Sequence, residues 1–245
     1  MRFGFGKNWI SFLGYLDNNR IKTAEDSLKE ILNVESLEGK TLLDIGSGSG
    51  LTSLAARNLG AAVTSFDFDK YSVEATEKLK NNFYPSDACW TVLQGSVLDD
   101  QFMEKLRDFD YVVSWGVLHH TGDMWHALRN VRNIPKDNHG VLFIALYNDQ
   151  GLISDYWTVV KKLYNSSLIG KLVMTILHYP YLVIFPIFLR LISGRTISPR
   201  GMTFWHDLHD WVGGYPFEVA SRSVIRDYFD EDFTLINSTF VGNRH

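Results

Sequence analysis

The chain has 245 residues, of which 45% are hydrophobic and 21% charged, and its formal net charge is −4. This composition is typical of a globular protein with a full core. The negative charge argues against broad electrostatic capture of nucleic acid, which depends on Lys and Arg neutralising phosphates, so we expect no nucleic-acid partner. The single cysteine, Cys89, excludes an internal disulfide and, without a cleavable signal pattern, favours a cytoplasmic location.

Residues 1–39 precede the first predicted strand and should form a helical cap. Apolar residues recur at helical spacing in the second half of this segment, which predicts one buried helix face. The residues on that face are Ile21, Ala24, Leu28, Ile31 and Leu32.

A glycine-rich turn at residues 44–50 separates the apolar pair Leu42 and Leu43 from a helix-like stretch at residues 51–59. A strand that enters a helix through such a turn lets a ligand approach the backbone and places its polar or anionic groups at the helix N-terminus. No Lys-Ser or Lys-Thr pair follows the turn, as a phosphate-binding Walker loop requires, and Leu51 stands where a dinucleotide fingerprint has its third glycine. The turn therefore predicts a nucleotide-like pocket of another kind.

Three further segments repeat the pattern of an apolar strand followed by a turn. Residues 62–66 predict a buried strand that ends at Asp67, at the separation from the glycine turn where a carboxylate can bind ribose hydroxyls. Residues 90–94 and 111–115 predict two more strands, which lead to Gly95 and Gly116. Strands that alternate with helices predict an α/β fold with a parallel sheet, whose ligands bind at the carboxyl edge.

Four motifs in this order resemble the class I S-adenosylmethionine-dependent methyltransferases, over roughly residues 38 to 147. They are residues 42–50, Asp67, residues 95–99 and residues 109–120. The resemblance implies a Rossmann-like, doubly wound and mostly parallel sheet that binds S-adenosylmethionine. A Rossmann-like domain with an empty or repurposed site is the alternative.

The resemblance also assigns residues to parts of the cofactor. Gly46, Gly48 and Gly50 would line its methionine part, Asp67 would hold the ribose hydroxyls, and Ser96 with Val97 would flank the adenine. The other expected cofactor contacts are Asp44, Ser47, Phe68 and Trp115. N-terminal extensions in small-molecule methyltransferases fold over the cofactor, so Trp9 is expected to close the pocket. The alternative is that the aromatic residues of this segment anchor it on the sheet.

Methyl transfer asks little chemistry of the protein, because the sulfonium of the cofactor is already activated. The protein must align the acceptor and, for a hydroxyl acceptor, remove its proton. His119 and His120 follow the fourth strand at the expected position of the methyl group, so they are candidate bases. Capping or supporting roles are the alternative for each.

A long segment follows the predicted fifth strand at residues 140–147, and we expect residues 149–230 to form a helical insertion that covers the substrate. Residues 172–192 are mostly apolar, and residues 151–201 contain six basic residues and one acid. A helical lid, a homodimer interface, contact of residues 168–195 with a membrane surface, and a membrane span all remain open.

A second cluster of aromatic and polar residues lies at positions 203–211, and His206 is its favoured candidate base. The i, i+3 pairs His206 with His209 and Asp207 with Asp210 lack a further ligand set, so we predict no metal site. A capped helix that packs its tryptophans on the sheet is the alternative.

Residues 233–240 predict the last core strand, within a final segment at 231–245 that follows a cofactor-binding core at residues 40–148. The seventh strand that closes the sheet in the family has no counterpart here, which predicts a weakened or dimer-protected edge. The sequence thus favours a methyltransferase for a small-molecule acceptor, at a hydroxyl of an aromatic, quinone-like or sugar compound. Transfer to nitrogen or carbon, and a noncatalytic cofactor-binding or membrane-docking module, are the alternatives.

Overall fold

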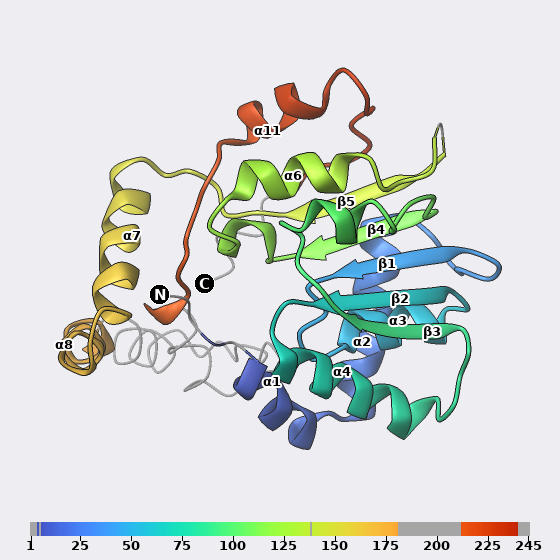
Figure 1. The fold of residues 1–245 in the computed structure, drawn as a ribbon, viewed down its shortest axis with the longest axis horizontal. Coiled ribbons are helices and arrows are strands. Elements are labelled where there is room, and N and C mark those ends of the chain that lie inside the picture. Colours follow the sequence, from blue (N-terminus) through green and yellow to red (C-terminus); the bar gives the residue numbers. More distant parts are fainter. Residues whose placement is uncertain (1–3, 5, 138, 181–211, 240–245) are drawn as a thin grey trace, which may run out of the picture.

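The structure is a computed structural model, and it describes residues 4, 6–137, 139–180 and 212–239. Its centre is a five-stranded sheet in the order β3-β2-β1-β4-β5, with every neighbouring pair parallel (Figure 1). The order reverses between β1 and β4, so the predicted α/β, doubly wound sheet is confirmed. The strands are β1 (Thr41–Ile45), β2 (Ala62–Asp67), β3 (Trp90–Gln94), β4 (Tyr111–Trp115) and β5 (Val141–Ala145).

Helices cover both faces of this sheet. Successive residues of a strand face opposite sides, so the consecutive apolar residues of these strands place side chains on both faces for helices to bury. Leu42 faces a core with the helices that precede β3, whereas its neighbour Leu43 faces a second core with the helices that follow β3. On the first face lie α2 (Asn18–Leu32), α3 (Leu51–Asn58) and α4 (Lys70–Phe83), and on the second lie α5 (Asp100–Met103), η2 (Leu118–His120), α6 (Met124–Arg132) and α11 (Arg222–Phe229).

The N-terminal segment is helical, as predicted. It contains α1 (Gly6–Phe12), the 3₁₀ turn η1 (Leu13–Tyr15) and α2, and the side chain of Asp17 caps α2 by accepting a hydrogen bond from the Arg20 amide. Of the residues on the predicted face, Ile21, Leu28 and Leu32 are buried. Helix α1 packs against α4, and the Gly6 amide donates a 3.0 Å hydrogen bond to Oδ2 of Asp69.

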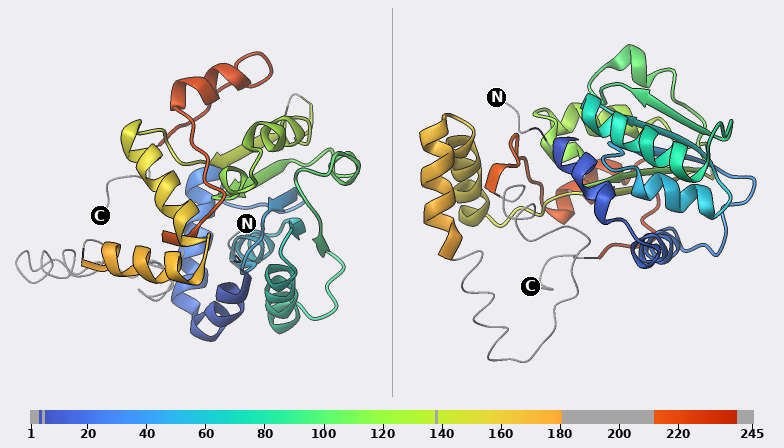
Figure 2. Two further views of the ribbon diagram at one scale, coloured as in Figure 1. Left: turned by 60° about the vertical axis from the view of Figure 1, so that its left-hand side comes forward. Right: turned by 90° about the horizontal axis from the view of Figure 1, so that it is seen from below.

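The insertion after β5 contains α7 (Leu152–Tyr164) and α8 (Leu168–Tyr179). The two helices pack on each other at one end of the molecule, away from the sheet (Figure 2). None of the helices in the described ranges has the length and hydropathy that a bilayer crossing requires. The apolar stretch at residues 172–192 lies within the described residues only as far as Pro180.

The prediction of a last core strand is wrong for its described part, because residues 233–239 form no strand. Only the start of this segment reaches the core, where the Phe233 ring lies 5.4 Å from that of Phe229. Leu235 and Ile236, which a strand in the sheet would bury, are 55% and 74% exposed. Within the described residues the sheet therefore ends at β5, and a dimer-protected edge stays a prediction.

Candidate active site

The loop between β1 and α3 needs its glycines for conformation and for space. Gly46, Gly48 and Gly50 have φ of +75°, +56° and +81°, a region that favours glycine. A Cβ atom at Gly46 would lie 2.5 Å from both methyl groups of Val117, the residue that follows Gly116 after β4. The missing side chain therefore lets the loops after β1 and β4 meet at the switch point of the sheet.

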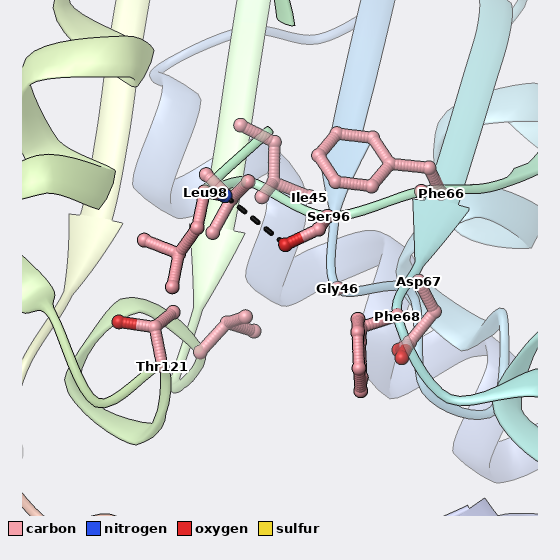
Figure 3. Close-up of a pocket in the computed structure, with 11 residues that line it drawn as sticks. Ile45, Gly46, Phe66, Asp67, Phe68, Ser96, Leu98 and Thr121 are labelled. Carbon is pink, nitrogen blue, oxygen red and sulfur yellow. Dashed lines mark hydrogen bonds between the residues drawn. The ribbon is translucent and has the colours of Figure 1, made fainter. Parts of the chain in front are cut away.

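A pocket opens at this carboxyl edge of the sheet (Figure 3). Its walls are mostly apolar, with one carboxylate at the end of β2 and the aromatic ring of Phe68 beside it. Five of the predicted cofactor contacts line it, namely Gly46, Asp67, Phe68, Ser96 and Val97. The other lining residues were not among the predicted cofactor contacts, although all but Thr121 lie in the motifs and strands that the sequence indicated; they are Ile45, Phe66, Gly95, Leu98, Val117 and Thr121.

Backbone amides hold the carboxylate of Asp67 in place. Its Oδ2 accepts a 3.0 Å hydrogen bond from the Gly48 amide, and its Oδ1 accepts a 2.8 Å bond from the Asp69 amide. A carboxylate oxygen can accept more than one hydrogen bond, which is the chemistry that a neighbouring diol requires. This arrangement fits a ribose, and the apolar walls formed by Val97 and Leu98 fit a purine ring.

Two other predicted contacts lie beneath the glycine loop. Asp44 is 3% exposed, and its Oδ2 accepts a 2.5 Å hydrogen bond from the Ser53 hydroxyl. Burial raises the pKa of Asp44 to about 6, and the nearby charge of Asp67 adds to this rise. Ser47 is buried and its hydroxyl is 2.9 Å from that of Thr76 in α4. In this structure both side chains support the loop from below.

Trp9 and Trp115 lie at the rim of the same edge. A Cβ atom at Gly48 would be 3.2 Å from Nε1 of Trp9, so the indole of α1 lies directly against the glycine loop. Its ring also meets that of Phe12, edge to face, at 6.1 Å. Trp115 ends β4, is 45% exposed and contacts the Phe143 ring at 5.4 Å. The contact with Gly48 places Trp9 at the glycine loop. Closure of the pocket by Trp9 remains a prediction.

His119 and His120 belong to an aromatic cluster between the ends of β4 and β5. The His119 ring lies 4.3 Å from that of His120 and 4.2 Å from that of Tyr147. Phe217, which precedes α11, extends the cluster, with its ring 5.2 Å from that of Tyr147. The backbone carbonyl of Pro216 is 2.6 Å from Nδ1 of His120. Since a carbonyl only accepts, Nδ1 carries the hydrogen, so Nε2 is the nitrogen that lacks a hydrogen whenever the His120 ring is uncharged.

His119 is 2% exposed, and neither of its ring nitrogens has a hydrogen-bond partner among the described residues. Its pKa is well below the ordinary value of 6.5, because burial disfavours the charged ring and the charges of His120 and Lys161 add to that effect. The ring is therefore neutral at neutral pH. Each buried nitrogen without a partner costs free energy, which a ligand at this position would offset.

Two residues outside the predicted site complete the cluster. Lys161 of α7 is 1% exposed, and its Nζ lies 4.9 Å from the centre of the Phe217 ring. The Glu218 amide donates a 2.9 Å bond to the His119 carbonyl, and its carboxylate accepts a 3.1 Å bond from the Met124 amide. Burial raises the pKa of Glu218. The segment before α11 is thus fixed to the loop after β4.

The third candidate base, His206, lies outside the described residues, as does the whole cluster at 203–211. Across the described ranges, no group of three His, Cys, Asp or Glu residues is placed to hold a metal ion.

Comparison with known proteins identifies the domain. Residues 43–142 match the family model for a methyltransferase domain. The chain is 36% identical over 86 residues to ribosomal protein L11 methyltransferase of Helicobacter hepaticus, covering 35% of this chain and 26% of the relative. It is 35% identical over 125 residues to the protein of that name from Prochlorococcus marinus, covering 49% and 40%. It is 31% identical over 117 residues to ubiquinone biosynthesis O-methyltransferase of Caulobacter vibrioides, covering 45% and 42%.

Residues 43–142 therefore form a methyltransferase domain, and the sheet order with the glycine loop makes it one of the class I, S-adenosylmethionine-dependent type. The lining of the pocket suits the adenosine of that cofactor, because a carboxylate held by the Gly48 amide lies beside apolar side chains. The chain spans less than half the length of the three relatives above.

Proposed function

We propose that this chain is an S-adenosylmethionine-dependent methyltransferase that acts on a small-molecule hydroxyl, in an aromatic, quinone-like or sugar compound. The observation that carries the acceptor assignment is the cluster of His119, His120, Tyr147 and Phe217, whose two histidines lie between Val117 and Thr121 of the pocket lining. Aromatic rings at van der Waals distance favour a planar acceptor, so an aromatic or quinone-like hydroxyl is preferred over a sugar.

The two histidines suit different tasks. The Pro216 carbonyl fixes the tautomer of His120, so that its Nε2 can accept the proton of an acceptor hydroxyl. The depressed pKa of His119 makes it a poor base, but its neutral ring can form a hydrogen bond with the acceptor. We assign His120 as the base and His119 as a residue that orients the acceptor.

Lys161 supports an acceptor that develops negative charge. Its buried ammonium lies next to Phe217 and is close enough to His119 to lower the pKa of that ring. A cation fixed beside the acceptor lowers the free energy of an oxyanion formed there. S-adenosylmethionine, when bound, supplies the activated methyl group, and the residues of this chain align the acceptor oxygen and take its proton.

The relatives differ in their acceptors, since one name specifies ribosomal protein L11 and another ubiquinone biosynthesis. Calorimetry should detect binding of S-adenosylmethionine and of its demethylated product. A turnover screen with hydroxylated aromatic, quinone-like and sugar compounds, and with ribosomal protein L11, then tests the acceptor. His120→Gln should lower kcat and leave cofactor affinity unchanged. Binding of a nicotinamide cofactor in place of both sulfur compounds would refute the proposal, and methylation of L11 alone would refute the small-molecule acceptor.

A further inference from the structure

Helices α7 and α8 present a large apolar surface to solvent. We define the α7–α8 surface by Leu152, Tyr156 and Val159 of α7 and Leu168, Leu172 and Ile176 of α8, all of which are more than half exposed. Leu152 and Leu168 reach 86% and 87%. The residues recur at intervals of three or four, so each helix presents one continuous apolar face.

The opposite faces of the two helices are already packed. Val160 and Tyr164 of α7 form a buried cluster with Val212, against which Met174 of α8 packs. At the edge of the α7–α8 surface, Nε2 of His178 in α8 also lies 2.7 Å from the Tyr156 hydroxyl of α7. These contacts hold the helix pair together without the outward leucines, which therefore contribute little to the core. Large exposed apolar patches on globular proteins mark interaction sites.

We propose that the α7–α8 surface docks on an anionic lipid bilayer. The charges on these helices favour that partner, because Lys162 and Lys171 are exposed and Asp155 is the one acid between residues 152 and 179. In the sequence, residues 151–201 carry a net charge of +5 within a chain of net −4. Apolar residues flanked by lysines are typical of helices that lie in a bilayer interface.

A second copy of the chain suits this surface less well. A two-fold interface brings the same patch of both copies together, so it would gather the exposed lysines of both copies, with only Asp155 of each helix pair to offset their charge. A lipid surface with anionic headgroups supplies the opposite charge and accepts the leucines among its acyl chains. In the described residues α8 is 12 residues long and its apolar side chains run along one side of the helix, so the proposed contact lies in the plane of the interface.

The position of the helix pair allows this approach. Helices α7 and α8 lie at the end of the molecule opposite β3 and α4, so the sheet does not obstruct a planar surface there (Figures 1 and 2). Helix α7 also carries Lys161 on its buried side, beside the aromatic cluster. Docking therefore brings the candidate acceptor site close to the bilayer.

Flotation of the full chain with vesicles tests the proposal, using phosphatidylcholine vesicles with and without phosphatidylglycerol. The chain should float with the anionic vesicles, and more weakly at high salt. Leu168→Glu with Leu172→Glu should lower the bound fraction by about tenfold. The control is Leu235→Glu with Ile236→Glu, which places the same charges on exposed apolar residues outside the surface and should float like the parent chain.

Circular dichroism establishes that each variant is folded, and Lys162→Glu, at an exposed position, replaces the α8 variant if that one is not. Absence of flotation by the folded parent chain, or equal flotation of the surface and control variants, overturns the proposal. A dimer in sedimentation that the α8 variant dissociates, without flotation, assigns the surface to a second copy instead. No methyl donor is needed, so the result is independent of the proposed function.

Discussion

The carboxylate of Asp67 at the end of β2 accepts a 3.0 Å hydrogen bond from the amide of Gly48 in the loop after β1. This bond joins the glycine loop to the residue expected to hold the ribose, so both parts of the pocket depend on one charged group. We predict that Asp67→Asn weakens S-adenosylmethionine binding by about 10- to 100-fold, since hydrogen bonds to a charged group contribute roughly 1.5–3 kcal/mol. Calorimetry measures the change.

Asp99→Asn is the matched control for this substitution. Asp99 follows β3 at the same edge and caps α5 by accepting a bond from the Phe102 amide, which an Asn side chain also accepts. Its loss of charge should leave the affinity for the cofactor within about twofold. Equal losses in both variants would mean that Asp67 acts only through the net charge of this edge.

Gly46 and Gly116 form a pair that separates backbone strain from steric overlap. Their φ values are +75° and +73°. A Cβ atom at Gly46 would overlap the methyl groups of Val117, whereas a Cβ atom at Gly116 would meet no atom within 4 Å outside its chain neighbours. Gly116→Ala should cost about 1–2 kcal/mol of unfolding free energy, from φ alone. Gly46→Ala should cost more and should also weaken cofactor binding, because Val117 lines the pocket.

Chemical denaturation of the two variants measures the difference. Adding Val117→Ala to Gly46→Ala removes the methyl groups that the new Cβ meets, and should restore part of the stability and the binding. If the two glycine variants lose the same stability, the overlap at Val117 is relieved by the loop and the argument from space is wrong.

The sequence could predict the cofactor pocket because its signals are local. The turn at residues 44–50, Asp67 and Ser96 each follow an apolar strand directly, and parallel strands bring their carboxyl ends to one edge. Positive φ at Gly46 follows from the tight turn itself. Gly46, Asp67 and Ser96 all line the pocket. The residue pattern alone indicated the glycine turn and Asp67, whereas the role of Ser96 was implied by the family resemblance, and binding of the cofactor by these residues stays a prediction.

Contacts between distant segments could not be predicted in the same way. Tyr147, Lys161 and Phe217 join His119 from three separate elements, and no spacing in the sequence indicates that they meet. The strand predicted at residues 233–240 is absent from its described part, residues 233–239. Its apolar residues suit a strand, but of the described residues 233–239 only Phe233 packs against the core, and strand propensity does not decide whether a partner strand is in reach.

Asp44 should make the chain less stable as pH rises. Its pKa in the folded chain is about 6, against 3.8 for an ordinary Asp, so the folded state holds the proton more tightly. The stabilisation is fully present below pH 3.8 and is lost as pH rises through 6, with a magnitude of up to ~3 kcal/mol. Asp44→Asn keeps an acceptor for the Ser53 hydroxyl without the charge.

Urea denaturation at about pH 4 and about pH 7 tests this prediction. From pH 4 to pH 7 the unfolding free energy of the parent chain should fall relative to that of Asp44→Asn, because the Asn side chain has no proton to lose. A constant difference between parent and variant across this range would show that Asp44 has an ordinary pKa in the folded state, and that the Ser53 hydrogen bond outweighs burial.

We expect His119 to make the chain less stable as pH falls, which is the opposite of the effect of Asp44. Its pKa in the folded chain is depressed well below 6.5, so the unfolded state takes up a proton first as pH falls. The stabilisation is present above pH 6.5 and is lost as pH falls towards the folded-state pKa, by up to about 1.4 kcal/mol per pH unit.

His119→Phe removes this dependence, and at neutral pH it should keep or raise the unfolding free energy, because it removes two buried nitrogens without partners in the described residues. His139→Gln, at an exposed position, is the control for loss of one imidazole. If His119→Phe lowers the unfolding free energy by several kcal/mol at neutral pH, the ring nitrogens of His119 are hydrogen-bonded in the folded chain. The proposal that they bind the acceptor would then lose its support.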